Sequence, residues 1–446
     1  MLLKEELLNK WAGVLDSEHL PQIKDEYRRS TIARVLENTE NELNKVSQMG
    51  YSQHLLEGDV PVNATGAGIS NFDPILISLV RRAMPNLVAY DICGVQPMTG
   101  PTGLIFAIRS RYSNQAGDET FYNEVKTDFS SVVTGANTLG QKHVGGLPGQ
   151  VASGNNITAN LASSGIYNFG SAMSTAQGEA LGATGNVDFN QMAFSIEKVT
   201  VEAKTRALKG EYTIEIAQDL KAIHGLDAEG EVSRMLSTEM LAEINREVVR
   251  TINVTAVPGS QINTTTAGIF DLDTDANGRW SVEKFKGLMF HLETECNQIA
   301  KETRRGKGNI MICSSNVASA LRMAGVLSYT PALNSNNLQV DDTGNTFAGV
   351  LNGQIRVYID PYAMGEYCTV GYKGANAFDA GLFYCPYVPL QLVRAVDQDT
   401  FHPKIGFKTR YGMVANPFAE GLNKGLGALT KDSNKYYRRS LITNLM

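Results

Sequence analysis

Residues 232–252 have the sequence VSRMLSTEMLAEINREVVRTI, in which apolar residues recur every three or four positions. This spacing predicts a helix with one apolar stripe, formed by Val232, Met235, Leu236, Met240, Leu241, Ile244, Val248, Val249 and Ile252. Pro258 and Gly259 follow and mark its end. At ~1.5 Å per residue, such a helix spans nearly ~40 Å, so we expect it to be the structural spine of one lobe.

The segments around this helix show a mixture of strand and helix patterns. Val199, Val201 and Ala203 alternate with polar residues, which predicts a half-buried strand. A second apolar stripe at 282–299 predicts a helix that ends in the basic stretch 304–308. Beyond it we expect a strand from Ile310, a helix at 316–323, and strands at 354–359, 367–372 and 390–396. The pattern predicts an α+β fold.

The composition is that of a folded protein without strong charge. The length of 446 residues suggests about three domains. Hydrophobic residues make up 43% and charged residues 19%, which excludes wholesale disorder. With 40 Lys and Arg against 46 Asp and Glu, the formal net charge is -6. No dominant phosphate-binding field follows from this balance, so we do not expect nucleic acid as a direct ligand.

Cysteine usage and apolar runs indicate the compartment. Five cysteines without a close pair (Cys93, Cys296, Cys313, Cys368 and Cys385) argue against a disulfide framework or a zinc site and favour a reducing compartment. No apolar run approaches the ~20 residues that cross a bilayer. Lys4 and Lys10 interrupt the place of a secretory signal. We expect a soluble protein made in the cytoplasm.

Residues 1–57, here called the leader, differ in composition from the rest, with 7 Lys and Arg and 10 Asp and Glu. Ile32, Val35, Leu36, Leu43 and Val46 recur at helical spacing, and Pro21 suits the start of a helix. Two interpretations stay open. The leader is either a solvated amphipathic helix that lies on the main body, or a helical assembly segment that binds another chain.

Residues 131–186 are rich in Gly, Ala, Ser, Thr and Asn, and only Lys142 and Glu179 carry a full charge. Such a stretch cannot build a large core, and a loop of this length is uncommon unless it is functional or disordered. We expect an extended arm that becomes ordered against a neighbouring subunit. A flexible glycine-rich loop is the alternative.

The chain offers one weak metal motif. Asp273, Asp275 and Asn277 are spaced like the first ligands of a calcium loop, but Lys284 stands where a bidentate carboxylate is required. We therefore favour an Asx-rich turn with Ser281 near the start of a helix. No metal and no cofactor is expected.

No catalytic motif is visible either. The six histidines are scattered, and neither HExxH nor GxSxG occurs. We expect His291 to be a hydrogen-bonded structural residue and the protein not to be an enzyme. Arg304 and Arg305 are interpreted as favourable charges at a helix C-terminus, or as partners for acidic residues across a subunit contact.

A candidate processing site lies at the end of the leader. Leu55, Leu56, Glu57 and Gly58 stand at the composition boundary, where a loop would be open to a protease. The pattern Leu-x-Glu also occurs at 3–5 and 241–243, but only Glu57 precedes a small residue in a predicted linker.

Five segments together resemble the major capsid proteins of T-even-like tailed phages. They are residues 71–98 (NFDPILISLVRRAMPNLVAYDICGVQPM), 100–103 (GPTG), 278–289 (GRWSVEKFKGLM), 304–309 (RRGKGN) and 413–418 (MVANPF). The resemblance spans nearly the whole chain. It implies the α+β coat-protein fold shared by tailed phages and herpesviruses, with an N-terminal arm, an extended loop, a peripheral domain with a spine helix, and an axial domain.

Mapped onto this chain, the resemblance implies six segments. These are a cleavable helical propeptide at 1–57, the N-terminal arm and start of the peripheral domain at 58–105, the extended loop with its glycine-rich arm at 106–198, the peripheral domain with the spine helix (228–253) at 199–281, the axial domain at 282–364, and a return to the peripheral domain at 365–446. A compact insertion domain in the extended loop is not expected.

The resemblance also implies a life cycle. A prohead protease that cuts after Glu in (Leu/Ile)-x-Glu maps onto Leu55, Glu57 and Gly58. The implied partners are other copies in hexameric capsomers, a vertex capsid protein, scaffold or core proteins, the portal, a folding chaperonin, outer decoration proteins and enclosed double-stranded DNA that is bound without sequence specificity. The subunit would assemble in the host cytoplasm and end in the virion.

Three alternatives remain at this stage. Within the family, the chain could be the vertex-forming paralogue, which builds pentamers. From other classes, it could be a calcium-dependent binding module that uses Asp273, Asp275 and Asn277, or a hydrolase. The hydrolase is the least favoured, because no nucleophile and base pair can be placed.

Overall fold

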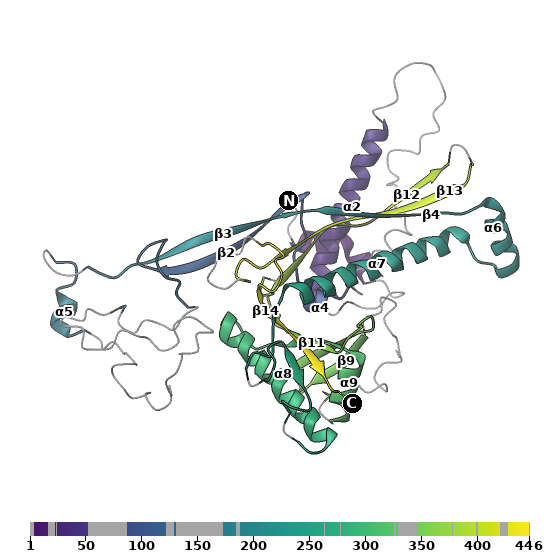
Figure 1. Cartoon of the computed structure of the whole chain (residues 1–446). Coiled ribbons are helices and arrows are strands. Elements are labelled where there is room, and N and C mark those ends of the chain that lie inside the picture. The colour runs from purple at the N-terminus through teal and green to yellow at the C-terminus, as the bar shows by residue number, and fades with distance from the viewer. Residues whose placement is uncertain are drawn as a thin grey trace.

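The computed structural model shows two lobes and a long two-stranded ribbon that projects from them (Figure 1). It describes residues 4–16, 23, 25–51, 87–121, 129–130, 173–183, 188–262, 264–276, 278–324, 327–328, 346–376, 378–397, 400–419 and 427–445. Among its described helices, none combines the length and apolar composition needed to span a bilayer. All five cysteines are buried as free thiols.

The peripheral lobe is built on a four-stranded sheet in the order β1-β12-β13-β4. The strands are β1 (Gly94–Val95), β12 (Leu382–Val396), β13 (Pro403–Ala415) and β4 (Lys204–Glu211). β12, β13 and β4 are antiparallel neighbours, and β1 is parallel to β12. The long helix α7 (Ala228–Thr255) runs along this sheet, and α6 (Ile214–Asp219) and the π-helical turn η2 (Leu220–His224) form the tip that joins β4 to α7 (Figure 1).

Helix α7 confirms the predicted spine. The Asp227 carboxylate caps its start by accepting a hydrogen bond of 3.1 Å from the backbone N–H of Gly230. Most of the predicted stripe is buried, but Met235 is 69% exposed. At this end of the helix the buried face runs through Ser233 and Ser237, whose small side chains the apolar pattern did not include.

The axial lobe contains an eight-stranded sheet and two helices. Its strands run in the order β5-β14-β11-β7-β10-β9-β8, and β6 pairs beside β14. They are β5 (Ala256–Pro258), β14 (Asn434–Thr443), β11 (Tyr367–Gly371), β7 (Ile310–Ser314), β10 (Ile355–Asp360), β9 (Thr346–Leu351), β8 (Leu327–Ser328) and β6 (Ile269–Asp271). The helices are α8 (Ser281–Thr303) and α9 (Ser315–Met323).

Strand β7 shows that the axial sheet is buried on both faces. Met311 and Cys313 belong to the apolar cluster that includes α8 and α9. Ile310 and Ile312 belong to the cluster that includes α7. Because successive side chains of a strand point to opposite faces, α7 lies between the axial sheet and the peripheral sheet and contributes to the core of both lobes.

Helix α8 confirms the second predicted helix and its ends. The Glu283 side chain accepts hydrogen bonds from the backbone N–H groups of Arg279 and Trp280, at 3.0 and 3.4 Å, and so caps the first turn. At the other end, Arg304 adopts a left-handed backbone conformation with φ of 55°. This residue stops the helix where the basic stretch begins.

The projecting ribbon consists of β2 (Thr102–Tyr112) and β3 (Met192–Glu202), paired antiparallel over their whole length. It corresponds to the base of the predicted extended loop, 106–198. Of the glycine-rich arm at 131–186, the structure describes only residues 173–183, which include the short helix α5 (Thr175–Glu179). The rest of the predicted arm lies outside the described residues.

The last segment of the chain differs from the expected boundaries. We expected residues 365–446 to return to the peripheral domain. Instead, β12 and β13 join the peripheral sheet, whereas β11 and β14 join the axial sheet beside β7. The axial lobe therefore extends past the predicted boundary at residue 364, because its central strands pair with strands that come much later in the chain.

Candidate assembly surfaces and processing site

The leader forms two helices, α1 (Lys4–Leu15) and α2 (Glu26–Tyr51), rather than the single helix that we predicted. Ile32, Val35 and Leu36 on α2 are at most 2% exposed. They share one apolar cluster with Trp11 of α1 and with residues of α4 (Ala89–Ile92), α7 and β12. The predicted amphipathic helix on the main body is therefore confirmed, although it enters the core more deeply than a solvated surface helix would.

Polar groups of α2 fix its position on the body. The Asn38 side-chain amide donates hydrogen bonds to the backbone carbonyls of Met98 and Tyr387, at 2.8 and 3.1 Å. Arg28 forms an ion pair with Asp91 of α4. Because buried carbonyls need donors, the leader satisfies polar atoms of the body as well as covering its apolar side chains.

The candidate cleavage residues Leu55, Glu57 and Gly58 lie outside the described residues. Helix α2 ends at Tyr51, shortly before them. Pro21 also lies outside the described part, and of Leu43 and Val46 only the helical backbone is described. The proposed cut thus follows directly after the helix that anchors the leader.

The burial of Ile32 leads to a testable prediction. Replacing Ile32 with Asp should destabilise leader docking by at least about 3 kcal/mol, because it removes buried apolar contacts and places a charge in the core. Hydrogen exchange of α2 amides in the unassembled chain should accelerate by at least about 100-fold. The control is Asn41→Asp at an exposed position of the same helix. Equal protection in both variants would show that the leader is not held by this contact.

One face of the ribbon is apolar and exposed. Its residues are Leu104, Phe106 and Ile108 on β2 and Met192, Phe194 and Ile196 on β3, each between 51% and 69% exposed. The two sets lie on neighbouring strands, with Ile108 directly opposite Ile196. A contiguous exposed apolar patch of this kind marks an interaction site. We call these six residues the ribbon face. The sequence signal for it was the alternation along β2, which we did not use.

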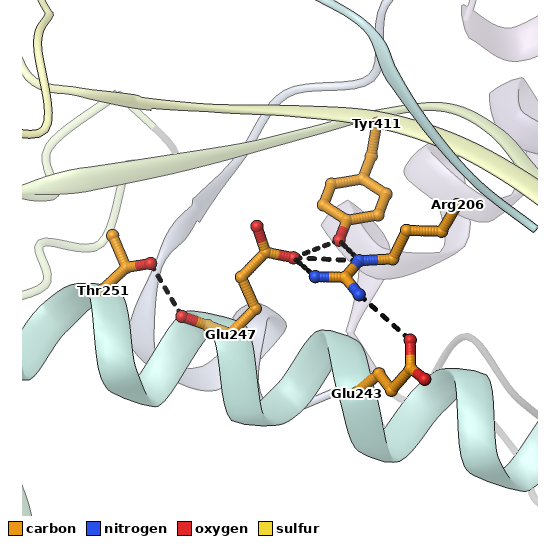
Figure 2. A network of polar contacts seen from close by, with 5 residues as sticks. All are labelled: Arg206, Glu243, Glu247, Thr251 and Tyr411. Atoms are coloured by element: carbon orange, nitrogen blue, oxygen red, sulfur yellow. Dashed lines mark hydrogen bonds and ion pairs between the residues drawn. The ribbon is translucent and has the colours of Figure 1, made fainter.

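A charged network joins the spine helix to the peripheral sheet (Figure 2). The Arg206 guanidinium of β4 donates to Glu247 at 2.5 Å and to Glu243 at 3.0 Å, both on α7. It also donates to the hydroxyl of Tyr411 on β13 at 2.5 Å. Burial, together with the Glu247 carboxylate, raises the pKa of Tyr411, so the phenol stays neutral and can donate to Glu247.

A second set of bonds joins α7 to the axial sheet. Arg246 of α7 donates to the Asp360 carboxylate of β10 at 2.6 Å, and the Tyr367 hydroxyl donates to the same carboxylate at 2.6 Å. Burial opposes ionisation of Asp360, but these hydrogen bonds outweigh it and lower the pKa of the carboxyl. With both networks formed, α7 is fastened to the two sheets that it separates.

A groove of about 1040 Å³ runs beside α7 and is lined by its charged residues and by residues 361–364. Its described lining residues include no serine, cysteine or histidine. The described lining therefore holds no Ser–His or Cys–His pair, although Thr251, Thr255 and Tyr362 carry hydroxyl groups there.

His291 is a buried structural residue, as predicted. Its Nε2 lies 2.9 Å from the Ser260 hydroxyl, and its ring stacks on Phe270. The Glu295 carboxylate lies 4.0 Å from the same nitrogen, so it does not orient the ring through the other nitrogen as in a catalytic triad. Ser260 is fully buried, and burial lowers the pKa of His291. These residues stabilise the loop before β6.

The calcium-like residues form the turn that we favoured. Asp275 accepts hydrogen bonds from the backbone N–H groups of Thr265 and Asp271, at 2.8 and 3.0 Å. Lys284 forms an ion pair with Asp273, and Asn277 lies outside the described residues. In the described part of the chain, no three His, Cys, Asp or Glu side chains form a cluster suited to a metal. The oxygens proposed as ligands instead bind protein donors.

The spine helix between two sheets, the projecting ribbon and the helical leader together define a virus coat protein (Figure 1). The fold is the α+β coat-protein fold of tailed phages. The chain belongs to the T-even-like major capsid proteins, since the family model described as Major capsid protein Gp23 matches residues 69–442.

Relatives match along the whole chain. The major capsid protein of Serratia phage KSP90 is 41% identical and that of Enterobacteria phage T4 is 36% identical, and the alignments cover at least 99% of both partners. The T4 capsid vertex protein is 28% identical over 50% of this chain and 53% of its own. The full-length match therefore places the chain with the major subunits.

Solved phage capsid structures also align with the chain. The capsid of Myoviridae phage XM1 covers 80% of this chain and 91% of its own, with 9% identity and a TM-score of 0.37. A structure from Microbacterium phage Oxtober96 covers 89% and 98%, with 9% identity and a TM-score of 0.37.

Proposed function

We propose that the chain assembles with copies of itself into capsomers, and that these form a shell that encloses double-stranded DNA. The observation that carries this proposal is the ribbon face, six large apolar side chains that a single subunit leaves in solvent. In a lattice, such a ribbon can lie across a neighbouring subunit and be covered by it. Heterologous contacts of this kind close into rings when the rotation between subunits allows it.

Processing is the second part of the proposal. A prohead protease cuts between Glu57 and Gly58, and the leader leaves the subunit. The remaining chain carries 33 Lys and Arg and 36 Asp and Glu, a balance that suits a lining that must not hold packaged DNA tightly. Removal of the leader bares the body surface that Ile32, Val35 and Leu36 cover. This loss of inner contacts shifts the population towards an expanded shell.

The remaining partners and the non-enzymatic role complete the proposal. The subunit meets the vertex protein, scaffold or core proteins, portal and decoration proteins, and is folded by a chaperonin in the host cytoplasm before it enters the virion. A structural role agrees with the full burial of Ser260 beside His291.

A substitution on the ribbon face tests assembly. Ile108→Asp should leave the unfolding temperature of the unassembled chain unchanged, because the side chain is 69% exposed. Covering this residue contributes about 1.5–3 kcal/mol at each contact, so the yield of shells should fall at least about tenfold. The matched control, Ile108→Val, should assemble normally. Electron microscopy and sedimentation measure the yield. Normal shells from the Asp variant would contradict a role of this face in assembly.

A further inference from the structure

A cavity of about 270 Å³ lies where the ribbon meets the C-terminal end of α8. It is lined by residues 108–110 of β2, by residues 119–121, by residues 303–305, and by Phe418 and Tyr436. Five short stretches of the chain therefore converge on it. The apolar cluster that includes the leader reaches this cavity at Tyr436 and Phe418.

Two buried donors at this cavity are without an acceptor. The Arg109 side chain is 1% exposed, and its Nη2 lies 3.2 Å from Glu197 and its Nη1 3.5 Å from Glu119. Within the described residues, the Nε group of Arg109 and the buried hydroxyl of Thr120 have no hydrogen-bond partner. Leaving a buried donor unpaired costs about 1–3 kcal/mol, so these two groups indicate an acceptor that the described residues do not supply.

The charges around the cavity favour an anion. Arg304 and Arg305 are exposed at its edge. The Phe418 ring holds two guanidinium groups by cation–π contact, that of Arg109 at 4.7 Å and that of Arg305 at 5.6 Å from its centroid. Glu119 and Glu197 balance only part of this positive charge, and burial raises the pKa of the Glu119 carboxyl. Arg305 is thus held in place with its charge free to meet a ligand.

We infer that this cavity binds a carboxylate, supplied by an aspartate or glutamate of a second copy of this chain. Arginine presents planar paired donors that match a carboxylate. Ile108 lines the cavity and also belongs to the ribbon face, so a subunit that covers the face contacts a residue of the cavity wall. A free phosphate would satisfy the same donors but would not cover the adjoining apolar side chains. The inference rests on the proposed function, since it requires a neighbouring subunit.

The chemistry of the cavity can be tested on the unassembled chain. The side-chain Nε–H resonance of Arg109, assigned by comparison with Arg109→Lys, is followed by NMR during titration with sodium acetate or sodium phosphate at constant ionic strength. We expect a saturable shift with acetate that weakens at least fivefold in Arg305→Ala. Lys301→Ala, at an exposed position in the last turn of α8, should keep it. If acetate causes no shift, the cavity is not a carboxylate site. If phosphate alone causes a shift, the cavity binds an anion other than a carboxylate.

The source of the carboxylate is tested in assembled shells. We expect a cryo-EM map to place an acidic side chain of a neighbouring copy within ~4 Å of Arg305. Arg305→Glu should reduce shell yield about tenfold, and reversing that acidic residue to Arg should restore it, whereas Lys301→Glu should assemble normally. An acidic residue of the same copy, or solvent, in the cavity overturns the proposed occupant. If the unmodified chain forms no shells, both the proposed function and the proposed occupant are contradicted. The acetate titration then still shows whether the cavity binds a carboxylate.

Discussion

Replacing Glu57 with Ala will leave the leader on every subunit, and particles will contain full-length chains of 446 residues. The glutamate is the residue after which the proposed protease cuts, and alanine removes the carboxylate that the protease recognises. With the leader retained, Ile32, Val35 and Leu36 stay in the core cluster, and Asn38 continues to bond the carbonyls of the body. The surface beneath α2 stays covered, so the shell should remain in its unexpanded form.

The matched control uses the second copy of the tripeptide pattern. Glu5 follows Leu3 and Lys4 but lies at the exposed start of α1. Glu5→Ala should therefore leave processing unchanged. The measurement is the subunit mass in particles from infection, together with particle diameter by electron microscopy. Subunits of mature length in expanded heads of the Glu57→Ala variant would refute the proposed site.

Replacing Arg438 with Met should destabilise the unassembled chain by about 3–5 kcal/mol, the cost of breaking a buried ion pair from one side. The Arg438 side chain is 4% exposed and binds Glu295 and Glu302 of α8, each at 2.6 Å. The Glu295 side chain is 3% exposed, and its remaining protein donor is the backbone N–H of Ser260, at 3.0 Å. Without the guanidinium, a carboxylate remains in the core between β14 and α8.

Denaturant unfolding of the unassembled chain measures this effect. Arg234→Met is the control, since its ion pair with Glu231 is on the surface with the arginine 70% exposed, and such pairs contribute about 0–1 kcal/mol. Adding Glu295→Met to Arg438→Met should recover part of the lost stability, because it removes the unpaired charge. A loss below about 1 kcal/mol in the single variant would mean that the ion pair does not hold β14 to α8.

The sequence by itself determined the long helices of the two lobes. Helical periodicity is a local property, so the apolar residues of α7 and α8 predicted both elements to within a few residues. The same holds for the first strand and helix after α8, whose alternation and spacing lie within one short window. The resemblance in residues 71–98 and four further segments identified the family because long matched stretches are specific.

The tertiary structure alone decided how these elements combine. Strands β13 and β14 were not predicted, and β14 pairs with β11 and β5, which come much earlier in the chain. Pairing partners are chosen by contacts between distant segments, and no local spacing encodes them. For the same reason, the sequence did not reveal that Met235 faces solvent or that the leader forms two helices seated in the core.

The ribbon shows most clearly what local sequence periodicity determines and what long-range packing determines. Alternating residues give β2 two faces, but only the packing around β2 decides which is covered. Ile105 and Arg109 face inward, and Phe106 and Ile108 face solvent. Two arginines, Arg109 and Arg111, after an apolar run in β2 were the sequence signal for the cavity at Arg109. Only the tertiary structure shows that Phe418 and Arg305, which are distant in sequence, lie beside Arg109. Local periodicity fixes the elements, and long-range packing decides which surfaces remain for partners.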